Sequence, residues 1–426
     1  MSYKRIGDFI ELVDERNRDL EVTTLLGLSI SKQFIPSVAN TIGTNMKTYK
    51  IIRKNQFACS VMQVRRDGKM PVALLKDFDE AIISQAYPVF QVIDETELLP
   101  DYLMMWFTRS EFDRQATFHA VGGVRGSLEW EDFLDFELPI PSIEKQQQIV
   151  AEYNTVTNRI QLNEKINNNL EATAQALYKH WFVDFEFPNT ENKPYKTSGG
   201  EMIYNEELDK EIPVGWSVKQ LNSFIGKTLG GDWGKSEKEG NYKMKVKCIR
   251  GTDIPTFKSG NTENAPIRYI LEKNHKNRKI EDYQIVIELS GGSPTQSTGR
   301  SVLVTKEHLK TTSIDLICSN FCRILTLNDK QYSILFQSHL EYLYNMNYLF
   351  MYENSTIGVK NFDLSSFLLD ELLIKPNKLV LAKFNSIYEI TLKEIINKRL
   401  EIKKLEELQS LLLAKMTQVE NKATLV

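Results

Sequence analysis

The sequence of 426 residues has few cysteines, few histidines and no long apolar run, and each shortage excludes a class of protein. Its four cysteines form no CxxC pair and no zinc spacing, so we expect reduced, partly buried thiols. Its five histidines show no metal-binding spacing such as HxxxH. The longest apolar runs, such as residues 411–414, are far shorter than the ~20 residues that cross a bilayer. The first residues lack the apolar stretch of a signal peptide, so we expect a cytoplasmic protein.

Motifs of the common catalytic centres are also missing. No two prolines are adjacent, which excludes the Asn/Asp-Pro-Pro-aromatic motif of a methyltransferase, and no Gly-x-Ser-x-Gly elbow occurs. Gly226-Lys227-Thr228 invites comparison with a phosphate-binding loop, but that loop needs a glycine where the chain has Leu221. We therefore expect a binding protein without a catalytic centre. Scattered nuclease carboxylates are the remaining catalytic alternative.

The overall charge does not indicate a nucleic-acid binder, because the net charge is −3. A local bias underlies this average. Residues 232–323 contain 16 Lys and Arg against 11 Asp and Glu, whereas residues 1–140 contain 16 against 21. A DNA-binding face in the first region would have to be built from a few local basic residues.

The most informative feature that is present is an internal repeat. Gly-Val-Arg at 123–125 returns as Gly-Val-Lys at 358–360, and Asp135, Leu138 and Pro141 match residues 235 positions later. The same offset continues without a gap far beyond the prolines. A weaker match, at an offset of 215, joins residues 6–10 to residues 221–225. Each repeat is therefore a variable segment followed by a segment of fixed length, and the variable segment of the second copy is 20 residues longer.

A heptad pattern of apolar residues marks the fixed part of each repeat and predicts a long helix. The seam includes Ile149, Tyr153, Ile160, Leu170 and Leu177 in the first copy, and Phe384, Tyr388, Ile395, Leu405 and Leu412 in the second. Asn163, Asn167 and Lys398 are polar seam residues, which in coiled coils fix partner and register at a cost in stability. The alternative is a pair of ordinary amphipathic helices packed on unrelated cores.

The remaining segments alternate short apolar runs with turn signals, which is typical of α+β domains. Residues 49–52, 57–64 and 86–92 indicate strands, and residues 101–115 indicate a helix. We predict a globular domain at 1–140, a helix at 141–188, a linker at 189–212, a second domain at 213–375, a second helix at 376–420 and a tail at 421–426.

Two loops contain the best candidates for binding. In the loop 290–300, glycines let backbone amides approach a phosphate, while Ser, Thr, Gln and Arg side chains bond phosphates or base edges. The candidates in this loop are Gly291, Gly292, Ser293, Thr295, Gln296 and Arg300, and Arg65, Arg66 and Lys69 occupy a comparable loop in the first copy. Arg125 and Lys360 recur at matching positions. The alternatives are hairpins that merely turn the chain, solvated charges and, for the last pair, a structural role.

This organisation resembles the specificity subunit of type I restriction-modification systems over nearly the whole chain. The resemblance rests on the Gly-Val-Arg stretch leading into Leu-Pro-Ile-Pro at 138–141, which is degenerate at 373–376, and on the Asn- and Glu-rich helix around 160–166. It also rests on Ile-Pro-Val-Gly-Trp at 212–216 and Gly-Gly-Ser-Pro at 291–294. The first half lacks the Ile-Pro-x-Gly-Trp opening and begins directly at residue 3.

The resemblance implies an α+β fold with two tandem target recognition domains, each reading one half of a split DNA sequence. It implies that the two helices form an antiparallel coiled-coil spacer with pseudo-two-fold symmetry, which sets the gap between the half-sites. Two methyltransferase subunits would dock, bind S-adenosylmethionine and methylate an adenine in each half-site, and restriction subunits that use ATP and Mg²⁺ can join them. No cofactor is expected in this chain itself.

Three alternatives differ in what they require. A fused restriction-modification enzyme needs a methyltransferase core of some 300 residues, whose motifs the sequence lacks. A coiled-coil adaptor that joins two proteins without touching DNA would not need two divergent polar loops on matched scaffolds. A recognition subunit of a methylation-only or related restriction assembly differs in its partners, and the sequence does not separate it from the main interpretation.

Overall fold

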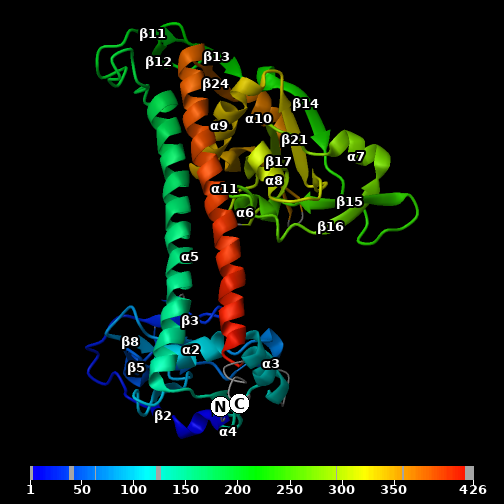
Figure 1. Cartoon of the computed structure of the whole chain (residues 1–426). Helices are drawn as coiled ribbons and strands as arrows, with labels where there is room; N and C mark the ends of the chain where they lie inside the picture. Colours follow the sequence, from blue (N-terminus) through cyan, green and yellow to red (C-terminus); the bar gives the residue numbers. More distant parts are fainter. Residues whose placement is uncertain are drawn as a thin grey trace, which may run out of the picture. The chain divides into compact units, whose positions relative to one another are not determined.

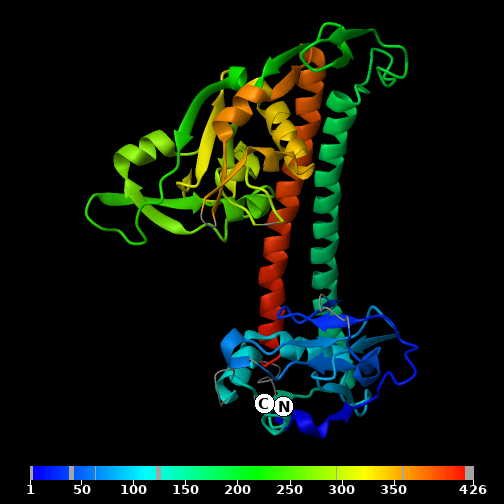
Figure 2. The same cartoon turned by 180° about the vertical axis from the view of Figure 1, so that it is seen from behind.

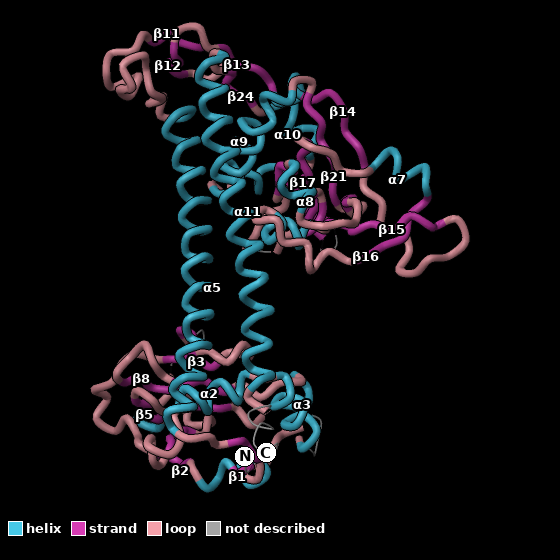
Figure 3. The backbone as a smooth tube through the Cα atoms, in the orientation of Figure 1, coloured by secondary structure: helices cyan, strands magenta, loops and turns pink. Residues whose placement is uncertain are grey.

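The computed structural model describes residues 3–37, 43–62, 64–120, 126–293, 295–356 and 359–417. Internal contacts divide the chain into a first unit, residues 1–160 with 404–426, and a second unit, residues 161–403. The division falls within two long helices, α5 (Ile143–Tyr178) and α11 (Lys378–Lys415), which Figure 1 labels. Short strands and short helices make up the rest of each unit (Figure 3). The predicted α+β class is confirmed.

The first unit is built on an antiparallel sheet of four strands in the order β2 (Ile10–Val13), β9 (Val89–Val92), β6 (Phe57–Cys59) and β7 (Val72–Leu74). Three smaller pairs join β1 (Tyr3–Arg5) to β10 (Glu137–Pro139), β3 (Leu26–Leu28) to β4 (Phe34–Pro36), and β5 (Lys50–Arg53) to β8 (Glu80–Ile83). Its short helices are α1 (Val64–Asp67), α2 (Pro100–Thr108), α3 (Ser110–His119) and α4 (Trp130–Leu134).

The second unit contains a four-stranded sheet in the order β14 (Ile225–Gly230), β21 (Cys322–Leu327), β17 (Gln284–Glu288) and β19 (Ser301–Val304). Two three-stranded sheets follow the orders β16 (Ile267–Leu271), β15 (Tyr242–Ile249), β20 (Leu316–Cys318) and β18 (Ser290–Gly291), β23 (Val359–Phe362), β22 (Glu353–Thr356). β13 (Ser217–Gln220) pairs with β24 (Leu372–Lys375), and β11 (Met202–Asn205) with β12 (Lys210–Pro213). Its short helices are α6 (Ile254–Phe257), α7 (Glu272–Arg278), α8 (Lys306–Lys310), α9 (Ser333–Asn345) and α10 (Leu364–Asp370).

The sequence repeat is also a repeat of strand register. Ile10 pairs with Val92 in the first unit as Ile225 pairs with Leu327 in the second, which reproduces both the offset of 215 and the offset of 235. Lys4 likewise pairs with Leu138 as Lys219 pairs with Leu373. The four-stranded sheets therefore correspond strand by strand, including central strands whose sequences show no match.

Strand register also locates the additional residues of the second copy. Phe57 and Phe90 pair as Ile285 and Leu325 do, so the central strands β6 and β17 differ by an offset of 228. The offset is 215 at the preceding strand of the sheet and 235 at the following one. Most of the insertion therefore lies between β14 and β17, where the second unit builds β15 and β16.

Each unit has an aromatic core that holds parts of both long helices. In the first unit, Phe57 and Phe90 stack at 5.0 Å, and Tyr153 of α5 and Met416 near the end of α11 pack against the same cluster. In the second unit, Phe384 of α11 packs edge-on against Phe182 at 4.8 Å. Burying such a side chain contributes roughly 1.5–3 kcal/mol, so the helix ends are firmly anchored in each core.

The heptad seam is occupied as the sequence predicts. In the second unit, the Asn167 amide donates to the backbone oxygen of Ile395 at 3.2 Å and Tyr178 contacts Phe384, so the two helical segments are antiparallel there (Figures 1 and 2). In the first unit, Gln409 donates to the Thr157 hydroxyl at 2.8 Å. The remaining predicted seam residues are buried or partly buried.

Two local predictions need correction. The helix expected at 101–115 is broken into α2 and α3, because Arg109 adopts an extended backbone and lays its guanidinium over the Trp106 ring at 4.2 Å. The strand expected at 57–64 ends at Cys59. The segment 189–212, expected as a linker, contains the hairpin β11–β12. Beyond it, Gly215, with a φ of +83°, turns the chain so that Trp216 stacks on Phe187 at 4.7 Å.

Candidate nucleic-acid interface

The two loops predicted from the sequence occupy equivalent places in the two sheets. Cys59 pairs with Val72 at the mouth of the β6–β7 hairpin, and Ile287 pairs with Ser301 at the mouth of the β17–β19 hairpin. The offsets between these pairs, 228 and 229, are those of the corresponding strands. The "first loop" (residues 60–71) and the "second loop" (residues 288–300) are therefore the same hairpin connection in the two copies.

The first loop exposes its cations. Arg65 and Arg66 lie on the single turn α1, where Arg66 is paired with the neighbouring Asp67 at 2.7 Å. Arg65 and Lys69 are exposed and, within the described part of the chain, have no ion-pair partner. The backbone of Arg65 donates to the oxygen of Gly126 at 3.1 Å, which places the loop beside the Gly-Val-Arg segment. Arg125 itself lies outside the described residues.

A buried ion pair fixes the end of the first loop. The ammonium of Lys32 lies 2.8 Å from the carboxylate of Asp113, and their side chains are only 7% and 12% exposed. The same carboxylate accepts a hydrogen bond from the backbone of Met70 at 3.2 Å. Burial lowers the pKa of Lys32, and the carboxylate opposes that shift. The residue next to Lys69 is thus tied to a buried charge.

A second buried ion pair closes the base of the second loop. The guanidinium of Arg300 donates twice to Glu288, at 2.8 and 2.5 Å, and the two side chains are 11% and 1% exposed. The bond to Glu288 raises the pKa of Arg300 above its usual range. Gly251 and Gly291 cover the carboxylate so closely that a Cβ at either position would collide with it. These two glycines are therefore required by packing.

The tip of the second loop is held from the other side by β22 and β23. Glu353 accepts hydrogen bonds from the backbone of Thr298 at 2.6 Å and pairs with Lys360 at 2.8 Å. Lys360 also lies over the Phe350 ring at 4.5 Å. Arg300 and Lys360, two candidates for DNA contact, thus have partners within the chain. Both residues position the loop in this structure.

The second loop forms one wall of a hollow of about 650 Å³. Four sequence candidates meet in it, namely Gly291, Gly292, Gln296 and Arg300, while Ser293 and Thr295 lie beside it on the same loop. The structure adds residues from three other segments: Trp233, Arg250, Gly251, Thr252, Ser319, Asn320 and Phe321. Sequence reasoning missed these because each is isolated in the chain. The one available signal was a lone aromatic, Phe321, within a polar turn.

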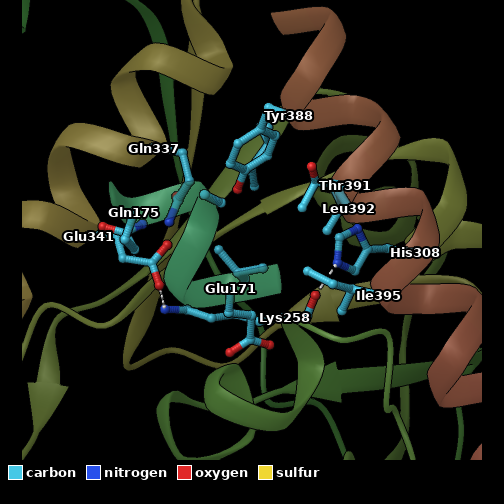
Figure 4. Close-up of a pocket in the computed structure, with 13 residues that line it drawn as sticks. Glu171, Gln175, Lys258, His308, Gln337, Glu341, Tyr388, Thr391, Leu392 and Ile395 are labelled. Carbon is cyan, nitrogen blue, oxygen red and sulfur yellow. Dashed lines mark hydrogen bonds and ion pairs between the residues drawn. The ribbon is translucent and has the colours of Figure 1, made fainter. Parts of the chain in front are cut away.

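A smaller cavity in the second unit is a packing defect. Its volume is about 40 Å³, well below the 300 Å³ or more of a typical ligand site, and it lies among α5, α9 and α11 (Figure 4). Lys258 pairs with Glu341 at 2.5 Å on its wall. The Thr305 backbone donates to Nδ1 of His308, so Nε2 of this histidine carries the proton and donates to the Lys258 oxygen at 3.1 Å. Burial lowers the pKa of His308 to about 4, so its ring is neutral.

Two searches of the described residues found no further kind of site. No group of three or more His, Cys, Asp or Glu side chains in them is placed to hold a metal ion. None of their helices combines the length and apolarity needed to cross a membrane. The candidate interface therefore consists of the two hairpin loops and the hollow.

Comparisons with known proteins give a consistent answer. Residues 4–172 match the family model of the type I restriction modification DNA specificity domain. The type I restriction enzyme MjaIX specificity subunit of Methanocaldococcus jannaschii is 24% identical over 339 residues, which cover 76% of this chain and 70% of that protein. The type I restriction enzyme HindI specificity subunit of Haemophilus influenzae is 28% identical over 139 residues, 32% of this chain and 30% of that protein.

A solved structure extends the likeness to the whole fold. The S subunit of a type I restriction-modification system from M. genitalium aligns with a TM-score of 0.56 at 13% identity, covering 97% of this chain and 95% of that chain. At this identity the likeness is one of fold. Together with the family match, it confirms what the motifs indicated: this chain resembles the specificity subunits of type I restriction-modification systems.

Proposed function

We propose that this chain is the DNA sequence-specificity subunit of a type I restriction-modification complex and reads a bipartite, asymmetric target. The observation that carries the proposal is the matched pair of sheets. Their strands keep the same register, whereas the hairpin loops between equivalent strands differ in length, charge and anchoring. A conserved frame with divergent loops is what two recognition domains need in order to read two different half-sites.

The domain assignments follow from this proposal. Residues 1–140 and 213–375 are the two target recognition domains, and the helices at 141–188 and 376–420 are the spacer between them. The first loop presents free cations, while the second presents glycine backbone and amides, so the half-sites are unlike. Phosphate contacts position a protein on DNA and base-edge contacts specify the sequence.

Two adenine methyltransferase subunits are the proposed partners, joined in some assemblies by restriction subunits. Two tandem copies of one scaffold offer equivalent docking surfaces to two identical partners, which is the symmetry of a dimer within a single chain. The methyltransferases would bind S-adenosylmethionine and flip the target adenine out of the duplex. This chain would hold the DNA in register and take no part in the chemical step.

The test is a base-resolution adenine methylome of cells that express this chain with its methyltransferase, compared with cells that lack only this chain. We expect a new split motif with two unlike halves and a fixed gap. If an active methyltransferase produces the same methylation with and without the chain, the specificity role is wrong and the adaptor interpretation is favoured.

The spacer role can be tested by lengthening both helices. We expect seven-residue insertions between Ile160 and Gln161 and between Lys403 and Lys404 to preserve the heptads and add about 10 Å of helix. The gap between half-sites should then grow by about three base pairs, given a rise of ~3.4 Å per base pair. A matched control inserts the same seven residues into the exposed loop 206–209. An unchanged gap in the doubly extended protein would show that the helices do not set the spacing.

A further inference from the structure

The hollow beside the second loop is not built to hold phosphates. Its two cations are already satisfied, because Arg300 is paired with Glu288 and Arg250 donates twice to Asp253, at 2.9 Å each. Contacts with the DNA backbone require cations or donors that are free to meet the phosphate charge. The side chains that remain exposed in the hollow are neutral: the amides of Gln296 and Asn320 and the ring of Phe321.

Phe321 is an exposed ring on a rigid backbone. Its side chain is 62% exposed, yet its backbone oxygen accepts hydrogen bonds from Leu289 at 2.7 Å and Ser290 at 3.3 Å. The turn that carries it is closed by a bond from Cys322 to Ser319 at 3.0 Å. An aromatic side chain with a fixed backbone loses little entropy on binding, which is how aromatic residues serve as contact anchors.

A second aromatic in the hollow is fixed in a comparable way. The Arg268 guanidinium stacks on the Trp233 ring at 4.3 Å and donates to the Trp233 backbone oxygen at 2.8 Å. Trp233 is 37% exposed despite these contacts. The hollow therefore has two held aromatic rings next to two free amides, and no unpaired cation among the described residues that line it.

The first unit lacks this arrangement at the equivalent turn. Strands β8 and β9 correspond to β20 and β21 at the offset of 235, which places Ala86 at the position of Phe321 and Gln85 at that of Asn320. An amide is thus found at one position in both units, whereas the aromatic ring is specific to the second. A role for Phe321 should accordingly concern one half-site alone.

We propose that Phe321 stacks on an unstacked base step of the half-site read by the second unit, while Asn320 and Gln296 contact base edges beside it. The inference rests on the proposed DNA-binding function and deepens it. Apolar side chains that wedge between base steps kink the duplex and select steps that unstack easily. Asn and Gln are suited to the paired donor and acceptor of a base edge.

The experiment uses the chain assembled with its methyltransferase and duplexes that carry the motif found in the methylome. The probe is 2-aminopurine, placed at successive positions of each half-site. We expect a fluorescence rise at one position in one half-site, and we expect Phe321→Ala to abolish it and to weaken binding roughly 10- to 100-fold. Phe321→Trp should retain both effects. Phe78→Ala, which removes a 42% exposed ring in the first unit, is the matched control and should change neither.

A cycle with altered DNA assigns the half-site. Phe321→Ala should have no further effect on a duplex whose corresponding half-site is already scrambled, and its full effect when the other half-site is scrambled. Unchanged binding by Phe321→Ala would overturn the proposal. Loss of methyltransferase from the assembly would overturn it as well, by placing the ring in a protein interface. If the wild-type assembly shows no chain-dependent DNA preference, the proposed function itself fails before any substitution is made.

Discussion

The first and second loops are the same hairpin connection in two copies, yet their charges are arranged differently. In the first loop, Arg65 and Lys69 are exposed, and the buried pair, Lys32 with Asp113, comes from other segments. In the second loop, the arginine itself is part of the buried pair with Glu288. The comparison teaches that a basic residue in a recognition loop is not necessarily a DNA contact, because it can be part of the frame that shapes the loop.

The largest expected effect comes from breaking these buried pairs. Glu288→Ala leaves the Arg300 guanidinium buried without its partner, which should destabilise the second unit by about 3–5 kcal/mol. Lys32→Met, which leaves Asp113 unpaired, should destabilise the first unit by a similar amount. Hydrogen exchange resolved by segment would show increased opening of the affected hairpin in each variant.

A double variant provides the control for this comparison. Glu288→Leu combined with Arg300→Met removes both charges and should cost less than Glu288→Ala alone, because no buried charge is left uncompensated. A double variant that is less stable than the single one would contradict the assignment of the pair as a frame element. Faster exchange in both units from one substitution would show that the two frames are not independent.

Acid should affect the second unit more than the first through buried histidines. Burial lowers the pKa values of His308 and His339 to about 4, while an unfolded histidine titrates near 6.5. The unfolded state therefore binds these protons first, so stability is lost as pH falls from about 6.5 towards 4. The expected loss is roughly 2 kcal/mol per histidine between pH 6.5 and 5. The first unit contains a single histidine, His119, which is exposed.

Urea unfolding of the two units at pH 7 and pH 5, followed by hydrogen exchange, would measure this difference. His308→Gln and His339→Gln should each flatten the pH dependence of the second unit, whatever they do to its stability at pH 7. His119→Gln is the control and should leave the slope unchanged. Equal acid sensitivity in the two units would show that other groups dominate the titration.

The smallest expected effect concerns salt. Arg65→Ala and Lys69→Ala should weaken binding to all sequences alike and each reduce the slope of log affinity against log salt by about 1, as expected when one phosphate contact is lost. Gln296→Ala should weaken one half-site without changing that slope. Lys54→Ala, an exposed lysine near Asp79 in the first unit, serves as the control. A salt slope that is insensitive to both Arg65 and Lys69 would remove the first loop from the phosphate contacts.

Much of the fold could be predicted because the repeat and the heptads are local, periodic signals. The seam residues Tyr153 and Phe384 were placed correctly because their spacing alone fixes which helix face is apolar. The break at Arg109 was not predictable, because the buried contact of its guanidinium with Trp106 overrides the helical pattern of the surrounding residues. The candidate loops were located correctly, since glycine and charge clusters mark hairpin connections.

By itself, the sequence determined the duplication, the two long helices and the position of both hairpin loops, because register and periodicity are written in the order of residues. It did not determine which charges are free. Arg300 and Lys360 look like Arg65 in a sequence, but their partners, Glu288 and Glu353, are chosen by strand pairing. The hollow likewise collects residues from four separate segments. Only the tertiary structure brings such groups within bonding distance, because ion pairing and burial depend on proximity in space.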